Sequence, residues 1–348
     1  MSEEQRTTKE GEGGGAEARP HILVLTSDAL FPHFFPAHVL ARLEEVGEWE
    51  HFNGREDSPE LRERLARADA LMTTWHSPFL RMEMLGSPRR VRLIAHCGGE
   101  LKARMEPEVV RELTVANAPG PMAAPVAEMA LAMLLTLVRQ LPRYEREMRA
   151  GLVQSNEVVS RGETVRGRRV GVVGFGRIGR AFARMVAPLG PELYIADPYC
   201  TEEAAAEHGA EKVEMEELLR ECSVVVLAAG LTDETRGMLD ARRLALMPDS
   251  AYLINVGRGG LVEMDALLAE LRSGRISAAL DVTDPVEPLP PEHELRRLPN
   301  VLLTPHIAAG GIEMRHALGE TAALEVARFF GGERPENVVT PEMLARMT

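Results

Sequence analysis

From His21 onward, short apolar runs alternate with longer stretches in which apolar residues recur every three or four positions. Short apolar runs bounded by turn residues are typical of strands covered on both faces, and the longer pattern is typical of amphipathic helices. The alternation therefore predicts an α/β protein built from βα units around parallel sheets. The first predicted strands cover residues 21–27, 68–75, 91–96 and 113–118, with helix-like stretches at 37–47 and 77–85.

A second series of apolar runs begins at Arg169, after a polar and irregular stretch at residues 148–167 that we predict to be a surface connection. Six such runs, each as long as a strand, would form a second doubly wound domain of about the usual size. A single predicted helix, from about Glu313 to Arg328, follows them, and a lone helix cannot form a domain. We therefore expect it to pack back onto the first sheet. The six predicted strands cover residues 169–175, 192–197, 223–229, 251–256, 277–282 and 300–305.

The predicted fold class is thus α/β, with two Rossmann-like doubly wound domains, the second inserted into a discontinuous first domain. We expect the first domain at residues 20–118 and 310–345, the inserted domain at 119–309, and a disordered tail at 1–19. The stretch 124–141 is almost entirely apolar, which predicts a long helix that is buried on most sides. Such a helix could join the domains or pack against a second subunit.

Composition narrows the possible partners. The 348 residues carry a formal net charge of −13, which disfavours nucleic acid because phosphate binding needs a basic face. No apolar run approaches the ~20 residues of a membrane span, so no membrane partner is expected. Cys97, Cys200 and Cys222 have no paired spacing, which argues against disulfides and a metal site and favours a cytoplasmic location. An anionic ligand would need local positive side chains.

A glycine pattern after the first strand of the second series indicates a dinucleotide site. Gly174, Gly176 and Gly179 form G-x-G-x-x-G between a predicted strand and a predicted helix. In this context the glycines permit a tight turn, close approach of a pyrophosphate and close helix–strand packing. Asp197 ends the next strand, where a carboxylate binds the ribose of NAD and repels the 2′-phosphate of NADP. The expected cofactor contacts here are Gly174, Phe175, Gly176, Arg177, Ile178, Gly179 and Asp197.

Three further groups follow later strands of the same sheet. Arg258 stands in a glycine-rich turn, Glu287 lies in a proline-rich loop, and His306 follows the last strand. Ligands of doubly wound sheets bind beyond the carboxyl ends of the strands, so these side chains should converge near the nicotinamide. Taken singly, they could be a surface ion pair, a solvated acid and a strand-end histidine. Their joint occurrence favours an active site, with further cofactor contacts expected from Thr232, Val256, Gly257 and Asp281.

At this point the sequence resembles the D-isomer-specific 2-hydroxyacid dehydrogenases over roughly residues 90–330. The motifs that carry the resemblance are GFGRIG, LTDETRGML, INVGRGGLVE, ALDVTDPVEPLP and TPHIAAG, in the order and approximate spacing of that family. The resemblance implies an NAD-dependent oxidoreductase that acts on a small 2-keto or 2-hydroxy acid. It implies that Arg258, Glu287 and His306 are catalytic, and that the helix at 124–141 forms a homodimer.

The physical chemistry of these residues agrees with such roles. The planar fork of Arg258 could bind the carboxylate and carbonyl of a 2-keto acid and stabilise the charge that develops on oxygen. His306 would donate a proton to that oxygen during reduction and remove it during oxidation. Glu287, paired with His306, would favour the protonated imidazole. A cleft between the domains would close at hinges near residues 118–124 and 306–312.

The first domain departs from the family pattern at the loop expected to bind the substrate carboxylate. Here the chain reads Gly98-Gly99-Glu100, where relatives have a small residue followed by an acid and a polar group. Lys102 could add positive charge or face solvent, and Trp75 and His76 could line the pocket or be structural. The stretch before Leu231-Thr232 also lacks the usual proline. These differences leave the substrate open.

An alternative from another class is an NAD(H)-sensing binding protein, because relatives of this fold include transcriptional corepressors. Retention of Arg258, Glu287 and His306 disfavours it. The resemblance also disfavours a formate dehydrogenase. Those relatives have Gln at the position that Glu287 occupies in this chain.

Overall fold

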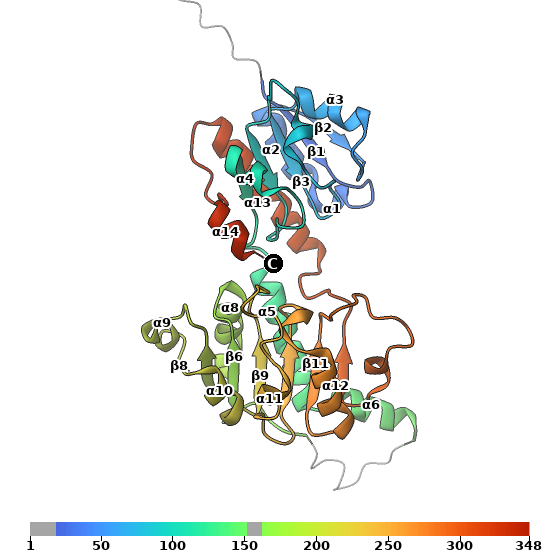
Figure 1. Ribbon diagram of the computed structural model, residues 1–348, viewed down its shortest axis with the longest axis vertical. Coiled ribbons are helices and arrows are strands. Elements are labelled where there is room, and N and C mark those ends of the chain that lie inside the picture. The colour runs from blue at the N-terminus through green and yellow to red at the C-terminus, as the bar shows by residue number, and fades with distance from the viewer. Residues whose placement is uncertain (1–18, 152–161, 348) are drawn as a thin grey trace, which may run out of the picture.

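The structure is a computed structural model that describes residues 19–151 and 162–347, and it consists of two lobes stacked end to end (Figure 1). One lobe contains a five-stranded sheet and the other a seven-stranded sheet. Every strand pairing in both sheets is parallel. The predicted fold class is confirmed. The predicted tail at residues 1–19 lies outside the described residues, apart from Arg19.

The first sheet has the strand order β2-β1-β3-β4-β5. Along β1, Ile22 and Val24 enter one hydrophobic cluster, whereas Leu23 and Leu25 enter the cluster on the opposite face. Both faces are therefore covered, which explains why its central strands read as continuous apolar runs. The strands are β1 His21–Leu25, β2 Glu48–Phe52, β3 Ala70–Thr73, β4 Leu93–His96 and β5 Thr114–Asn117.

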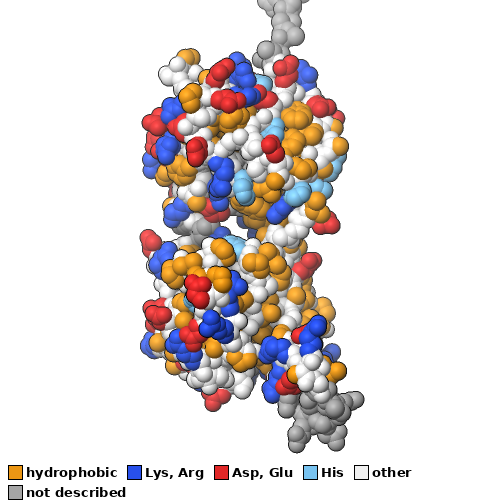
Figure 2. All heavy atoms as spheres, turned by 90° about the vertical axis from the view of Figure 1, so that its right-hand side faces the viewer, with side chains coloured by type: hydrophobic (Ala, Val, Ile, Leu, Met, Phe, Trp, Pro, Cys, Tyr) orange, Lys and Arg blue, Asp and Glu red, His pale blue; other side chains and the backbone are white. Residues whose placement is uncertain are grey.

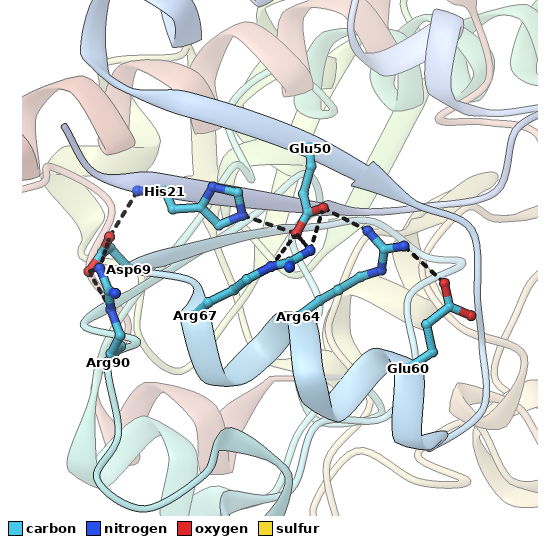
Figure 3. A network of polar contacts seen from close by, with 7 residues as sticks. All are labelled: His21, Glu50, Glu60, Arg64, Arg67, Asp69 and Arg90. Carbon is cyan, nitrogen blue, oxygen red and sulfur yellow. Dashed lines mark hydrogen bonds and ion pairs between the residues drawn. The ribbon is translucent and has the colours of Figure 1, made fainter.

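The edge strand β2 was not predicted from the sequence, because most of its residues, EWEHF, are polar. A network of charged side chains holds it (Figure 3). Glu50 accepts a hydrogen bond of 2.6 Å from Arg64 of α3 (Pro59–Arg67) and also pairs with Arg67 and with His21 of β1. Burial raises the pKa of Glu50, but the bonds from His21 and the two arginines outweigh it and lower the pKa below its usual value. Strand β2 is thus held by paired charges in addition to the packing of Trp49 and Phe52 against the two hydrophobic clusters.

The C-terminal helix α13 (Ile312–Phe330) belongs to this first domain. It packs against α1 (Phe31–Phe34), α2 (Ala37–Val46) and strands β3 to β5. The packing is close, because a Cβ on Gly319 would lie 1.7 Å from the carbonyl oxygen of Phe34. The predicted return of this helix is confirmed, so the second domain is inserted into the first.

The second sheet has the order β12-β11-β10-β9-β6-β7-β8. Six of its strands were predicted, and the seventh, β8, was missed because its three residues, Ala-Glu-Lys, carry no apolar run. Helices α5 and α8 cover one face, where α5 packs closely on α8. The strands are β6 Arg169–Val173, β7 Glu192–Ala196, β8 Ala210–Lys212, β9 Val224–Leu227, β10 Tyr252–Asn255, β11 Ser277–Leu280 and β12 Val301–Leu303. The helices are α5 Ala123–Val138, α8 Arg177–Val186, α9 Glu202–Ala206, α10 Met215–Glu221, α11 Ala241–Leu244 and α12 Met264–Ser273.

The largely buried helix predicted at residues 124–141 is α5, but it ends at Val138, three residues earlier than expected, and a second helix, α6 (Leu141–Arg149), follows. Gln140 adopts a left-handed conformation with φ 52° between them, and Pro142 begins the new helix. The two helices are bent by 55°, and only this bent pair has the length and composition of a possible membrane span; no single described helix does. Of the predicted irregular stretch at 148–167, residues 152–161 lie outside the described residues.

Two further expectations from the sequence need correction. The helix-like stretch 77–85 is a loop that ends in the short 3₁₀ helix η1 (Met82–Leu85). The C-terminal segment after α13 contains helix α14 (Pro341–Arg346), which packs against α4 (Pro107–Glu112). Val339 beside it donates a backbone hydrogen bond of 2.8 Å to Val115 of β5. The C-terminus is therefore part of the first domain's core.

Candidate active site

The carboxyl edges of the two sheets face each other across a waist between the lobes, which is visible in Figure 2. Arg258 follows β10 of the second sheet and is half-buried. Burial lowers the pKa of its guanidinium, whereas the charges of Glu100 and Glu287 act to raise it. Because Glu100 follows β4 of the first sheet, the two domains contribute to one charged site.

The turn that carries Arg258 is fixed by its own backbone and by Asn255. The Asn255 side chain donates a 2.9 Å bond to the carbonyl of Arg258 and accepts one of 3.1 Å from the N–H of Gly257. The glycines are required by close packing: a Cβ on Gly257 would lie 2.7 Å from the carbonyl oxygen of Ala229, and one on Gly259 would lie 2.1 Å from the backbone of Thr283. The turn therefore holds a single guanidinium in a defined place at the edge of the sheet.

His306 and Glu287 form a pair beside this turn. Their Nδ1 and Oε1 atoms are 2.6 Å apart, and both side chains remain partly exposed. With Nδ1 directed to the carboxylate, Nε2 is the nitrogen left to exchange a proton with a ligand. His306 also has φ 53°, a left-handed conformation that residues other than glycine rarely adopt. The surrounding structure must hold it there.

Asp281 supplies that support. Its side chain is 2 % exposed, and its carboxylate accepts bonds of 2.6 Å from the Thr304 hydroxyl, 2.9 Å from the N–H of Ile307 and 2.8 Å from the N–H of Ala308. Its carbonyl accepts a 2.8 Å bond from the N–H of His306. From the sequence, Asp281 was expected to contact the cofactor. Its hydrogen bonds to the segment around His306 could not be predicted, because they depend on the backbone conformation of that segment.

The glycine loop has the geometry of a phosphate cradle. Gly174 has φ 90°, and a Cβ there would lie 2.6 Å from the backbone of Ala229. A Cβ on Gly179 would lie 2.2 Å from the carbonyl oxygen of Gly174, so only glycine lets the helix sit this close. Gly176, by contrast, faces open space and begins α8 without a side-chain cap. An uncapped helix N-terminus beside open space suits an anionic group.

Asp197 lies against this loop. It accepts hydrogen bonds of 2.6 Å from the N–H of Phe175 and 2.7 Å from the N–H of Tyr199. Arg177 is exposed at the start of α8, and Ile178 packs against the core below. The residues present thus fit a dinucleotide, with open space for the pyrophosphate and a carboxylate at the end of the neighbouring strand.

The remaining residues expected at the cofactor occupy the same edge of the sheet. Thr232 donates a backbone bond of 2.7 Å to the Thr235 hydroxyl, which in turn donates 2.7 Å to the carbonyl of Gly230, so these residues form a tight turn after β9. Val256 is 4 % exposed and packs into the core, which leaves its backbone at the edge.

The first domain contributes the loop after β4. Gly98 is buried, and a Cβ there would lie 2.8 Å from both His96 Nε2 and Trp75 Nε1. Asn117 donates a 2.8 Å bond to the carbonyl of Gly99, and Glu100 accepts 2.7 Å from the N–H of Ala103. The loop is thus held from within the domain, whereas Lys102 is exposed.

Trp75 and His76 follow β3 at the same edge and are half-buried. The carbonyl of Trp75 accepts a 2.9 Å bond from Arg104, and its ring lies edge-on to Phe34 with 5.5 Å between centroids. No group of three or more side chains suited to a metal ion occurs among residues 19–151 and 162–347.

A dinucleotide cradle, a guanidinium and a carboxylate–imidazole pair at facing sheet edges define the class of nicotinamide-dependent dehydrogenases. The sequence profile of the "D-isomer specific 2-hydroxyacid dehydrogenase, NAD binding domain" matches residues 131–308. A glyoxylate reductase of Korarchaeum cryptofilum is 34% identical over 286 residues, which cover 81% of this chain and 86% of that protein.

Solved structures of similar fold agree with the family that the sequence profile indicates. The TT0316 protein of Thermus thermophilus has a TM-score of 0.77 and 32% identity, covering 92% of this chain and all of the other. D-mandelate dehydrogenase of Rhodotorula graminis has a TM-score of 0.80 and 25% identity, covering 92% of this chain and 98% of the other. The chain belongs to the D-isomer-specific 2-hydroxyacid dehydrogenase family. It is therefore an oxidoreductase that acts on CH–OH donors with a nicotinamide cofactor.

Proposed function

We propose that the protein reduces a small 2-keto acid to its D-2-hydroxy acid, with Arg258, Glu287 and His306 as catalytic residues. The observation that carries this assignment is the pair of His306 and Glu287, 2.6 Å apart, beside the half-buried guanidinium of Arg258. One fixed cation and one proton donor are what the reduction of a 2-keto acid requires from the protein.

In this mechanism Arg258 binds the substrate carboxylate and polarises the carbonyl with its planar fork. A dinucleotide with its pyrophosphate at the glycine loop would supply the hydride from its nicotinamide. His306 Nε2 donates a proton to the carbonyl oxygen, and Glu287 orients the imidazole through Nδ1. The hydrogen bonds of Asp281 keep His306 in place through the cycle.

We propose that the backbone of Gly98, Gly99 and Glu100 faces the substrate carboxylate from the first domain. The electrostatic effect of Glu100 on Arg258 supports this placement.

The domain boundaries that we propose lie at residues 118–119 and 309–310, where the chain crosses from one sheet to the other.

NAD is the proposed cofactor rather than NADP, because Asp197 lies beside the glycine loop, bonded to Phe175. A carboxylate there accepts hydrogen bonds from ribose hydroxyls and repels a 2′-phosphate. The proposal keeps the other expected cofactor contacts, which are Gly174, Gly176, Arg177, Ile178, Gly179, Thr232, Val256, Gly257 and Asp281.

A homodimer is proposed through α5 and α6. Leu135, Leu141 and Met148 on these helices are exposed large apolar side chains, and such groups favour burial against a partner.

A cytoplasmic location is proposed because Cys97, Cys200 and Cys222 are buried free thiols.

The test is a panel of 2-keto acids, including glyoxylate, pyruvate and hydroxypyruvate, with NADH oxidation followed by absorbance. We expect turnover of at least one of them, with the D-isomer as product and a higher kcat/KM for NADH than for NADPH. Binding of NADH without turnover of any 2-keto acid would overturn the proposed function.

A further inference from the structure

A group of basic side chains lies at the carboxyl edge of the first sheet, on the substrate side of the site. We call Arg55, His76, Arg104 and Arg315 the distal cluster. Arg55 follows β2, His76 follows β3, Arg104 follows the Gly98-Gly99 loop, and Arg315 lies in the first turn of α13. Figure 2 shows histidine and Lys/Arg side chains along the edge of this lobe that faces the waist.

Contacts link the chain segments that carry Arg104, His76 and Arg315, because the ring of Phe34, the neighbour of His33, lies 5.5 Å from the ring of Trp75. Arg104 donates a 2.9 Å bond to the carbonyl of Trp75, the neighbour of His76. An Nη1 atom of Arg315 lies 3.1 Å from Nδ1 of His33. Burial lowers the pKa of His76, and the positive charges of Arg55, Arg104 and Arg315 lower it further. Three guanidinium groups from three separate segments thus act electrostatically on one imidazole.

The cluster has polar atoms without partners. Nδ1 of His76, Nε of Arg104 and Nε of Arg315 are buried without a hydrogen-bond partner among the described residues. Glu100 approaches Arg104, but its Oε2 is 3.7 Å from Nε, beyond hydrogen-bond distance. Buried polar groups in folded proteins are normally paired, so the two unpaired guanidinium N–H groups point to a missing acceptor.

Several other arginines of this domain are matched by acids. Arg62 binds Asp57 through two nitrogens, Arg64 and Arg67 share Glu50, and Arg90 binds Asp69. The distal cluster, by contrast, has one acid, Glu100, near its three arginines, in a chain of net charge −13. Its positive field would attract an anion.

We propose that the distal cluster binds a second anionic group, a carboxylate or a phosphate, at the end of the substrate remote from the reacting carbonyl. This inference rests on the proposed function, in which Arg258 binds the first carboxylate. Arg258 is close to Glu100, Glu100 to Arg104, and Arg104 to His76, so the cluster adjoins the same site. The substrate is then a dianionic 2-keto acid with several carbons, and glyoxylate is too short to reach both ends.

The test compares pairs of 2-keto acids with the same carbon skeleton that carry one or two anionic groups. The pairs are 2-ketoglutarate with 2-ketovalerate, and 3-phosphohydroxypyruvate with hydroxypyruvate, measured with NADH. We expect the wild-type kcat/KM to be at least about tenfold higher for the dianionic member of one pair, a preference that weakens at high salt. Which pair shows it distinguishes a carboxylate from a phosphate.

The variants are Arg55→Gln, which alters an exposed side chain, and Arg315→Gln. Each should lower kcat/KM for the preferred dianionic acid by about tenfold, chiefly through KM, and should change it far less for the monoanionic partner. Arg89→Gln, an exposed arginine before β4 at the opposite edge of the sheet, is the matched control and should change neither.

Equal kcat/KM for both members of each pair, or equal losses for both in the variants, would overturn the distal site while leaving the proposed function intact. A protein that reduces no 2-keto acid at all would overturn both.

Discussion

His306 and Asp281 illustrate how single residues set the chemistry. The left-handed conformation of His306 is unfavourable for a residue with a Cβ, and Asp281 offsets that cost with bonds to three groups of the following segment. Glu287 then fixes the ring through Nδ1. The imidazole is therefore positioned before any ligand arrives, which is the purpose of preorganised sites.

His96, which lies beneath the Gly98 loop, gives the residue-scale prediction. It is fully buried, and burial, followed by the charge of Arg104, lowers its pKa to about 3. The unfolded chain binds a proton at about pH 6.5, but the folded protein does not, so stability must fall as the pH drops from about 6.5 towards 3. The contribution is at most ~1.4 kcal/mol per pH unit.

Urea unfolding at about pH 7, 6 and 5 measures this slope. His96→Gln should lose the contribution, so its stability falls less steeply with acid than that of the wild type, and His38→Gln, at an exposed histidine, is the matched control. The same slope in His96→Gln and in the wild type would show that His96 is not the responsible group.

At the scale of elements, the three glycines of the cofactor loop have different physical tasks. Gly176→Ala places a methyl group in open space, so the fold should tolerate it, but that space is where a pyrophosphate must approach. We expect an NADH Kd at least about tenfold higher with little change in thermal stability. Gly179→Ala meets the carbonyl of Gly174 at 2.2 Å and should cost about 1–3 kcal/mol of stability.

Titration of NADH fluorescence and thermal unfolding of both variants separate the two effects. Wild-type NADH affinity in Gly176→Ala would contradict the assignment of this loop to the cofactor.

The elements also show what could be predicted from the sequence. Strands buried on both faces were found because their apolar runs reflect burial directly, and Arg258, Glu287 and His306 could be placed at one edge because strand ends converge in a parallel sheet. Strand β2 was missed because the ion pairs of Glu50 replace an apolar pattern. The break at Gln140 was missed although Pro142 marks a helix start. The distal cluster joins segments far apart in sequence, so no local pattern reveals it.

At the scale of the whole molecule, the insertion of one domain into the other makes two sheet edges face each other. The second domain contributes the cofactor loop and the three proposed catalytic groups, and the first contributes Glu100 and the distal cluster. Charges of both signs thereby gather at the waist of a chain that is negative overall. Closure about residues 118–124 and 306–312 stays a prediction, which would bring these groups together and exclude water.

The most direct test of this arrangement is the steady-state kinetics of Arg258→Ala with NADH and the best 2-keto acid of the panel. We predict that kcat/KM falls by roughly a hundredfold to a thousandfold, because the variant loses the group that binds and polarises the substrate. The Kd for NADH should stay close to that of the wild type, and Arg297→Ala, at an exposed arginine of the same domain, should be fully active. Wild-type kcat/KM in Arg258→Ala would contradict the proposed mechanism.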